Sequence, residues 1–283
     1  MSTTEKAPRQ RSIEIGNPSS FSYQFGHNDY FQQEAVMLRT VKAMKGFSIG
    51  AKDGDIGETV DFIFDDKAWT IRYVVVDTGK WLSGRRVLIS PIVVGPADWE
   101  NKRIPVLLNQ EQVKNSPDIS LNEELSQQDE IKYYDHFGWP YYWMGDDIWG
   151  PASVPTELAL EGIERQKVLT ESVNQSHLRS AREVVDYSIK STDGDIGRVS
   201  DFIADDTQWT IRYIVVDTRT WWPGKKVLVA PQWIAHVDWR NSNVYLNLSQ
   251  NQIKTGPEFH PSDFKHNYDQ ELYENRGRSN FGS

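Results

Sequence analysis

An internal repeat constrains this chain more than any other feature of its sequence. The segment Asp53–Gly57, with the sequence DGDIG, recurs 140 residues later as Asp193–Gly197. The same offset aligns residues 38–118 with residues 178–258 without a gap, and 36 of these 81 positions are identical. Solenoids repeat more often and with periods of about 20–50 residues. The sequence therefore predicts two copies of one domain.

The repeat divides the 283 residues into five segments. They are an N-terminal extension (1–37), a first repeat (38–118), a connector (119–177), a second repeat (178–258) and a C-terminal segment (259–283). Serine, glutamine and asparagine are frequent near the N-terminus, so we expect residues 1–36 to be a largely disordered tail. We expect the C-terminal segment to form a short helix or tail.

Negative charge is concentrated in the connector. The chain has 31 basic and 40 acidic residues, and the connector carries −8 of the resulting net charge of −9. This acidity disfavours binding to nucleic acid through phosphate contacts, and it disfavours docking on an anionic membrane surface. Each repeat is close to neutral, so a local basic patch on a repeat stays compatible with the sequence.

The composition argues against several kinds of site. There is no cysteine, which excludes disulfides, thiolate nucleophiles, zinc–thiolate sites and iron–sulfur clusters. None of the six histidines recurs at the offset, and neither a Ser-His-Asp pattern nor a phosphate-binding loop is present. We therefore expect no catalytic residues, no metal and no cofactor. With no apolar stretch long enough for a signal or a membrane span, we expect a cytoplasmic protein.

Each repeat has the pattern of a β-rich domain. Asp53-Gly54-Asp55 separates two runs of strand-forming residues, and Asp-Gly there is a strong hairpin signal because such turns need residues that tolerate positive φ. Short strands at this spacing are typical of a small barrel or sandwich. The strands predicted in the first repeat are Phe47–Lys52, Ile56–Phe64, Trp69–Asp77, Val87–Ser90, Val93–Asp98 and Arg103–Leu108.

Helices are predicted to be few and short. We expect them at Asn109–Asn115, Asp129–Phe137 and Leu178–Val185. In the last of these, Glu183 follows Ser180 by three residues, which is the spacing of a capping box.

Three motifs give the repeats a resemblance to a known family. They are DGDIG, then WTIRY followed by VVVDT or IVVDT, then a WxxG loop with two basic residues and Val-Leu. In this order they resemble the PRC-barrel family, named for the cytoplasmic domain of the photosynthetic reaction centre H subunit. The resemblance implies a mainly β fold with two small PRC-type β-barrels in tandem and short flanking helices. Tyr133–Trp143 resembles the aromatic, proline-containing tail that often follows such a barrel.

The resemblance also implies a class of function. The family has no generally recognised catalytic set, and it includes many bacterial proteins of undetermined role. We therefore expect a non-catalytic scaffold or adaptor that binds a protein partner, related by resemblance to the reaction-centre H subunit. Two alternatives stay open, a sensor for a small ligand or ion and an accessory role in RNA processing. The gapless duplication further predicts that the two barrels pair within the chain about a pseudo-twofold axis.

Tryptophans supply the candidate partner-binding residues. A loop of the second repeat, Arg219–Pro223, carries two of them in succession, and exposed aromatic patches mark binding surfaces. The alternative is that the rings are buried in the core, where their large area stabilises folding. For the aromatic segment 133–149 we favour burial against a barrel. The candidates are Trp81, Trp221, Trp222 and Trp233.

Arg72 and Arg212 are the candidate anion-binding residues. They occupy equivalent positions in the long strand of each repeat, and a guanidinium group binds oxyanions well. The alternative is an ion pair inside the sheet.

Acidic residues cluster near the turns of each repeat. Asp53, Asp55 and Asp61 could bind a hard cation with their carboxylates, but we favour a hairpin turn, in which Asp and Gly supply the backbone conformation. We expect Asp65-Asp66 and Asp205-Asp206 to be solvated turn residues.

Overall fold

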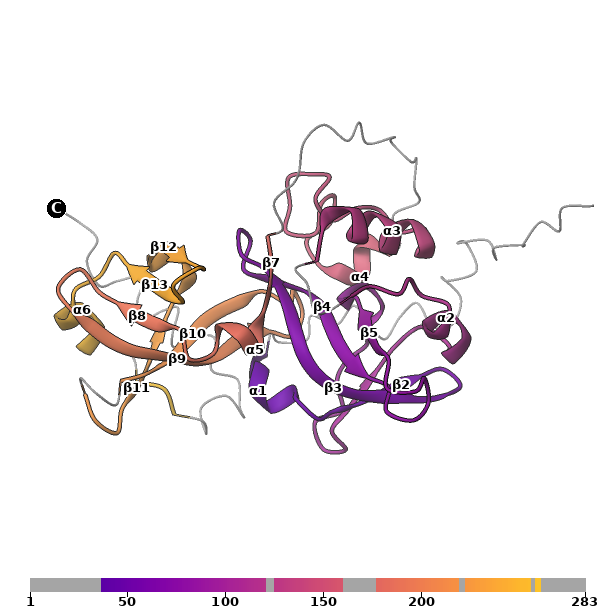
Figure 1. Cartoon of the computed structure of the whole chain (residues 1–283), viewed down its shortest axis with the longest axis horizontal. Helices are drawn as coiled ribbons and strands as arrows, with labels where there is room; N and C mark the ends of the chain where they lie inside the picture. The colour runs from indigo at the N-terminus through magenta and orange to yellow at the C-terminus, as the bar shows by residue number, and fades with distance from the viewer. Residues whose placement is uncertain (1–36, 121–124, 160–176, 219–221, 256–257, 261–283) are drawn as a thin grey trace, which may run out of the picture. The chain divides into compact units, whose positions relative to one another are not determined.

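A computed structural model describes residues 37–120, 125–159, 177–218, 222–255 and 258–260. The predicted N-terminal tail and most of the C-terminal segment lie outside the described residues. Within them the chain is mainly β, as the sequence predicts, and its strands form two sheets (Figure 1). None of the described helices is long and apolar enough to cross a membrane.

The first sheet is built mainly from the first repeat. Among the described residues its strand order is β5-β4-β3-β2-β6. β7 also pairs with β3, at residues 63–65, whereas β2 pairs with residues 54–58. β6 runs parallel to β2, and the other pairs are antiparallel. The strands are β2 (Ser48–Ala51), β3 (Gly54–Asp65), β4 (Thr70–Asp77), β5 (Arg86–Ile89), β6 (Arg103–Pro105) and β7 (Leu178–Ser180).

The second sheet repeats this arrangement 140 residues later. Its described strands have the order β11-β10-β9-β8-β13-β12, and β1 pairs with β9. The strands are β1 (Leu38–Thr40), β8 (Ser188–Lys190), β9 (Asp195–Asp205), β10 (Ile211–Asp217), β11 (Lys226–Val229), β12 (Ile234–Asp238) and β13 (Asn243–Leu246).

The helices are short, as expected. Two of them, α2 and α6, begin with a capping box and close the two repeats. Two one-turn 3-10 helices follow β5 and β11. The helices are α1 (Val41–Met44), α2 (Gln110–Lys114), α3 (Gln127–Phe137), α4 (Pro155–Leu158), α5 (Ala181–Val184) and α6 (Gln250–Lys254), and the 3-10 helices are η2 (Pro91–Val93) and η3 (Pro231–Trp233).

The two repeats exchange their first strands. β1 of the first repeat pairs with β9 of the second, and β7 of the second repeat pairs with β3 of the first. The registers are equivalent, because Leu38 lies opposite Asp205 and Leu178 lies opposite Asp65. Each repeat thus completes its sheet with a strand from the other.

An aspartate secures each exchanged strand, and Asp61 of this pair is buried. Asp61 accepts hydrogen bonds from the Ser180 hydroxyl (2.6 Å) and from the backbone N–H of Arg182 (3.1 Å). Asp201 accepts from the N–H of Lys42 (3.0 Å) in the equivalent place. Each aspartate therefore binds the first turn of the other repeat's short helix, where N–H groups lack partners within the helix.

The repeats also meet at two tryptophans with unusual backbone conformations. Trp69 and Trp209 have φ of 50° and 60°, in the left-handed region that residues other than glycine adopt rarely. The carbonyl of Trp209 accepts from the N–H of Ile71 (2.7 Å), and that of Trp69 accepts from the N–H of Ile211 (2.6 Å). These reciprocal bonds between the repeats hold the strained conformation in place.

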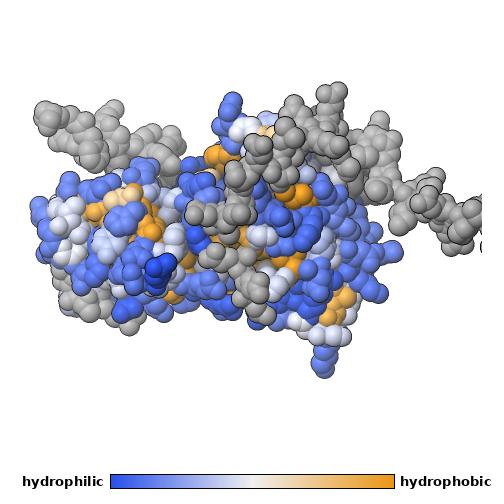
Figure 2. Space-filling model, turned by 45° about the horizontal axis from the view of Figure 1, so that its top comes forward, coloured by the Kyte–Doolittle hydropathy of each residue, from blue (hydrophilic) through white to orange (hydrophobic). Residues whose placement is uncertain are grey.

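The hydrophobic core is continuous through both repeats. One cluster of buried side chains includes residues from each, and Phe64 of the first contacts Phe202 of the second, with ring centroids 5.7 Å apart. On the face drawn in Figure 2, hydrophobic residues lie in small groups separated by hydrophilic ones.

Two predictions of local structure were wrong. Leu178–Ser180, expected to begin a helix, is a strand, because pairing with β3 outweighs the local helical pattern. In the predicted strand Val93–Asp98, the chain forms a 3-10 helix up to Val93 and only isolated bridges at Val94 and Asp98. Pro91 at the first position of η2 fixes φ at a helical value and favours this turn.

We predict that Asp61→Ala lowers the free energy of unfolding by about 2–3 kcal/mol. The substitution leaves the Ser180 hydroxyl and the Arg182 N–H of the exchanged strand without their acceptor. Asp55→Ala is a suitable control, because Asp55 lies in an exposed ion pair with Arg103 that contributes little. Urea unfolding of the full chain measures both values, and equal effects of the two substitutions would contradict the role assigned to Asp61.

Candidate functional site

The connector begins with a well-capped helix, α3. The hydroxyl of Ser126 accepts from the N–H of Asp129, and the Asp129 carboxylate accepts from the N–H of Ser126, which forms a capping box. The helix ends at Gly138, which has φ of 70° and allows the chain to turn back. The predicted helix Asp129–Phe137 is thus confirmed, with its first turn two residues earlier.

One face of α3 packs against the first sheet. Glu130, Tyr133 and Tyr134 are buried and follow one another at helical spacing. The Tyr133 hydroxyl donates to the carbonyl of Leu88 on β5 (2.9 Å) and accepts from the N–H of Ser90 (3.2 Å). Its ring meets that of Tyr73 edge-on, with centroids 5.3 Å apart. The helix is therefore held by polar and aromatic contacts together.

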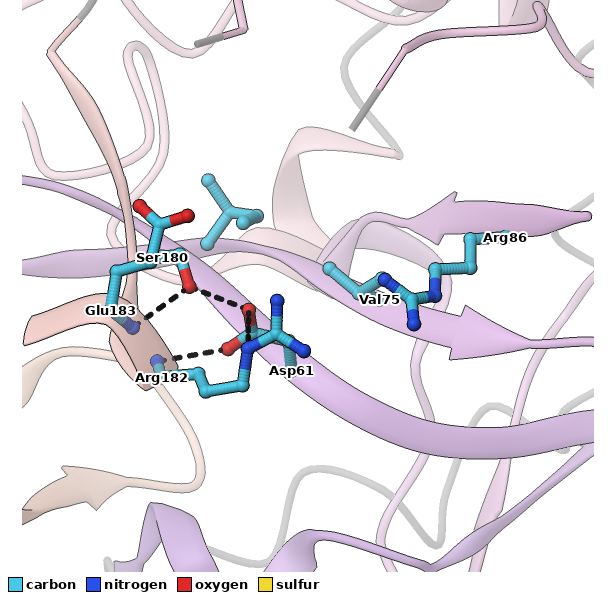
Figure 3. A pocket seen from close by; sticks show the side chains of 7 residues that line it. Asp61, Val75, Arg86, Ser180, Arg182 and Glu183 are labelled. Atoms are coloured by element: carbon cyan, nitrogen blue, oxygen red, sulfur yellow. Dashed lines mark hydrogen bonds and ion pairs between the residues drawn. The ribbon is translucent and has the colours of Figure 1, made fainter. Parts of the chain in front are cut away.

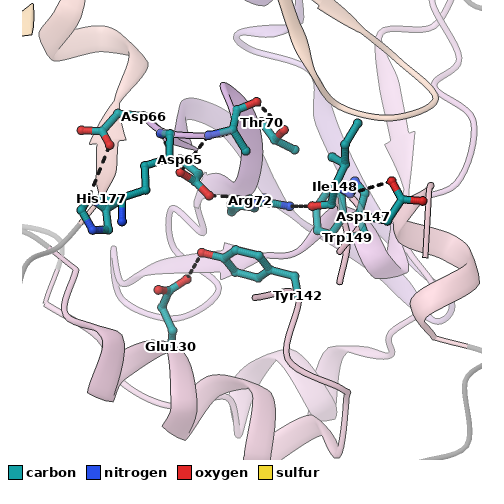
Figure 4. A network of polar contacts seen from close by, with 12 residues as sticks. Asp65, Asp66, Thr70, Arg72, Glu130, Tyr142, Asp147, Ile148, Trp149 and His177 are labelled. Carbon is teal, nitrogen blue, oxygen red and sulfur yellow. Dashed lines mark hydrogen bonds and ion pairs between the residues drawn. The ribbon is translucent and has the colours of Figure 1, made fainter. Parts of the chain in front are cut away.

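Glu130 is the buried acid of this contact. The residue is 7% exposed, and its Oε1 accepts hydrogen bonds from two hydroxyl groups. One is Tyr73 of β4 (3.0 Å). The other is Tyr142 of the connector (2.8 Å), whose bond to Glu130 is drawn in Figure 4. A single carboxyl oxygen thus joins the helix, the sheet and the following connector segment.

Arg72 lies beside this carboxyl group and faces the same connector segment. It is only 2% exposed. Its guanidinium donates to the carbonyl of Ile148 (2.8 Å) and to Asp65 (3.3 Å) (Figure 4). It also lies over the rings of Tyr142 (3.9 Å to the centroid) and Trp149 (4.7 Å). This candidate anion-binding residue is therefore engaged by groups of the chain itself.

The burial of Glu130 shifts its protonation. Desolvation disfavours the carboxylate and raises the pKa of Glu130 to about 7, against the opposing hydrogen bonds from Tyr142 and Tyr73 and the positive charge of Arg72. Burial likewise raises the pKa of Tyr73 and Tyr142 well above the usual value of tyrosine, so both hydroxyls stay protonated and act as donors. The cluster therefore contains one group that titrates near neutral pH.

The sequence analysis did not identify Glu130. The available signal was its position on α3, because positions 130, 133 and 134 share one helical face and the other two carry tyrosines. A carboxyl in an aromatic stripe indicates a buried acid. Its partners Tyr73 and Tyr142 are distant in sequence, so only the tertiary structure identifies them.

Arg212, the equivalent of Arg72, has different surroundings. Its side chain is 30% exposed, and its guanidinium donates to Asp205 (2.8 Å) and to the side-chain oxygen of Gln208 (2.6 Å). The connector reaches this region through Trp149, whose Nε1–H donates to the carbonyl of Gln208 (2.9 Å). Both arginines thus keep the ion pair to the preceding turn, and the connector covers Arg72.

The paired acids of the turns are largely covered by the protein, contrary to the sequence-based expectation. Asp65 and Asp205 accept backbone N–H groups of their own turns and pair with the arginines, and Asp205 is fully buried. Asp66 pairs with Arg179 of the exchanged strand (3.0 Å). Burial raises the pKa of Asp206 to about 6, although a backbone bond from Met37 opposes the shift. The strand exchange therefore covers these turns.

The acids of the DGD turns have structural roles. Asp53 accepts from the N–H of Gln110 at the start of α2 (2.8 Å), and Asp193 accepts from Gln250 at the start of α6 (2.7 Å). Within the described residues no three histidine or acidic side chains are grouped as metal ligands. The turn aspartates thus attach the last helix of each repeat to its first hairpin.

The candidate tryptophans within the described residues are all partly buried against the core. Trp81 lies between β4 and β5 and Trp233 ends η3, and both are partly buried against the core. Trp222 is also partly buried, and Lys225 lies over its ring, 5.8 Å from the centroid. Trp221 lies outside the described residues.

A small open depression lies where the strands are exchanged (Figure 3). Asp61 lies within it and is engaged by Ser180 and Arg182, so its carboxylate serves the junction of the repeats. The lining residues are Asp61, Ile63, Val75, Arg86, Ser180, Arg182 and Glu183.

Comparison with known proteins adds no family to this description. No family model matches the chain, and no significant relative was found among curated proteins.

We predict that the stability of the protein falls as pH rises through the range 4.5 to 7. The folded protein binds a proton on Glu130 more tightly than the unfolded chain does, so folding is favoured at the acidic side of this range. The shift corresponds to about 3 kcal/mol. Glu130→Gln, which stays neutral, is expected to remove this component from the free energy of unfolding measured by urea titration between pH 5 and 8.

The control for this measurement is Glu157→Gln, which changes an exposed glutamate of the same connector. It is expected to keep the pH dependence of the wild type. A pH profile of Glu130→Gln identical to that of the wild type would show that Glu130 does not titrate in this range.

We further predict that Arg72→Lys destabilises the fold more than Arg212→Lys. Lysine cannot reach Ile148, Asp65 and the two rings at once, so a buried charge loses most of its partners, at a cost of about 3 kcal/mol. The more exposed Arg212 position tolerates lysine at a cost of about 1 kcal/mol. Chemical unfolding of the two variants compares equivalent positions in one chain, and a larger loss at Arg212 would contradict the asymmetry.

Proposed function

We propose that this protein is a non-catalytic scaffold or adaptor that binds a protein partner through the surface of its connector. The proposal includes the resemblance to PRC-barrel proteins, in which each repeat corresponds to one small barrel. In the first repeat, the motifs that carry the resemblance lie on β3, β4, β5 and the turns between them, and α3 of the connector packs against β4 and β5.

The main support comes from a set of partly exposed rings at the end of α3 and directly after it. Phe137 and Trp139 stack with centroids 4.5 Å apart and ring planes at 12°, and Tyr141 and Trp143 stack at 4.8 Å and 8°. Met144, at 39%, is the single large hydrophobic side chain classed as exposed in the described part of the chain. We call Phe137, Trp139, Tyr141, Trp143 and Met144 the aromatic surface. Aromatic residues and methionine are enriched at protein interfaces.

The charge around the aromatic surface indicates the kind of partner. Asp135, Asp146 and Asp147 are exposed next to it in the chain, and the connector has a net charge of −8. Aromatic faces attract cations, and acidic neighbours strengthen that attraction. The partner favoured by this chemistry is a basic segment of another protein, rich in arginine or lysine.

This surface replaces the tryptophan loops as the leading candidate. The rings of both sets are partly buried against the core, but Trp81, Trp222 and Trp233 are far apart in the sequence, whereas the aromatic surface is one short segment with an exposed methionine and acidic neighbours. The small-ligand alternative would rely on Arg212 rather than Arg72, because Arg212 is the more exposed of the two. The RNA alternative is disfavoured by the acidic connector.

We predict that Trp139→Ala combined with Met144→Ala abolishes capture of the partner. Immobilised full-length protein is incubated with an array of basic and acidic peptides and with extract of the native cell. Basic ligands are expected to bind the wild type and to lose at least tenfold in affinity with the double variant, because its stacking and apolar contacts are lost.

Trp81→Ala serves as the control and is expected to retain binding. A double variant that folds normally and binds every ligand of the wild type would overturn the proposed site. Preference for acidic peptides would overturn the proposed class of partner.

A further inference from the structure

The connector after α3 forms a strap, residues 139–152, that is tied to both repeats. Its first N–H, from Trp139, donates to the carbonyl of Tyr134 (3.0 Å). Trp149 donates to Gln208 of the second repeat (2.9 Å). Between these ends, the strap is held to α3 by Glu130 through Tyr142 and to the first repeat by Arg72 through the carbonyl of Ile148. Tyr142 and Trp149 are buried in the core, and Glu130 and Arg72 supply the polar contacts that hold the strap on the α3 side.

We propose that Glu130 makes this strap a proton-sensitive latch, closed when the carboxyl group is protonated and loosened when it is ionised. One oxygen of Glu130 accepts hydrogen bonds from the hydroxyls of both Tyr73 and Tyr142. Ionisation of that single group therefore acts on the contact of the strap with β4 and on the contact of α3 with β4 at once.

The groups around the carboxyl do not provide a direct counter-ion. β4 contributes Arg72 and Tyr73, the end of β3 contributes Asp65, α3 contributes Tyr134, and the strap contributes Tyr142. The guanidinium of Arg72 is directed at Asp65 and Ile148 (Figure 4). No described cation forms an ion pair with Glu130 in the closed arrangement. A carboxylate there would be buried with hydroxyl donors alone, which is costly compared with exposure to water.

The energetic consequence follows from linkage. In the closed state the pKa of Glu130 is about 7, whereas a carboxyl group fully returned to water has the ordinary value of 4.5. The equilibrium constant for opening then rises about tenfold between pH 6 and pH 8.5. Except for Phe137, the aromatic surface is on the strap, so the ordered arrangement of these residues is most populated at acidic pH. This regulation of binding rests on the proposed function, whereas the latch itself does not.

Amide hydrogen exchange of the full-length protein tests the latch without any partner. Exchange of residues 139–152 is measured at pH 6 and pH 8.5 and corrected for the intrinsic dependence of exchange on pH. In the wild type these amides are expected to open about tenfold more at pH 8.5, while the strands β3 and β9 keep their protection. Equal corrected rates at the two pH values would overturn the proposal.

Three variants make the test specific. Glu130→Gln is expected to give the same corrected rates at both pH values, and Glu157→Gln is expected to keep the tenfold ratio. Tyr142→Phe removes the hydroxyl that attaches the strap to Glu130, so it should raise exchange at pH 6 and reduce the ratio. A tenfold ratio retained in Glu130→Gln would assign the effect to another group.

The outcomes separate the two proposals. If the double variant Trp139→Ala with Met144→Ala still binds every ligand, the proposed function fails while the exchange data can still support the latch. If binding is lost in that variant but strap exchange is independent of pH, the function stands and the latch fails.

Discussion

The reciprocal exchange of first strands is the interaction on which the rest of the structure depends. β1 and β7 are three residues long and cannot form stable structure alone, because a short strand gains its hydrogen bonds only from a neighbour. Each finds that neighbour in the other repeat, and Asp61 and Asp201 bind the turn that follows. The exchange also buries the acidic turns and joins the two cores through Phe64 and Phe202. The repeats are therefore interdependent parts of one folded unit.

The connector breaks the symmetry that the exchange creates. Arg72 and Arg212 occupy equivalent positions and make the same ion pair to the preceding turn, but the strap covers Arg72. Burial makes Arg72 dependent on its neighbours, because a charge removed from water is stabilised only by the partners that remain in contact with it. The same covering places Glu130 among tyrosine hydroxyls and brings its titration near neutral pH. The connector thus gives two equivalent sheets different surroundings.

Sequence reasoning succeeded where the signal was local. The DGD hairpin turns, the long strand that became β4 and the helix that became α3 follow from turn chemistry, β-propensity and capping, all of which act over a few residues. It failed at Leu178–Ser180 and at Asp65-Asp66, where the deciding partner lies more than 100 residues away in the chain. It also missed Glu130, because no pattern in the sequence pairs it with Tyr73 and Tyr142.

The sequence by itself determined that this chain contains one β-rich domain twice, with an acidic, aromatic connector between the copies. Repetition, alternation of residue types and turn residues are properties of the chain and need no fold to be recognised. Only the tertiary structure decided which strands are exchanged, which arginine is covered and which carboxyl is buried. These outcomes depend on contacts between distant segments, and the environment of a charge, more than its identity, sets its protonation and its partners.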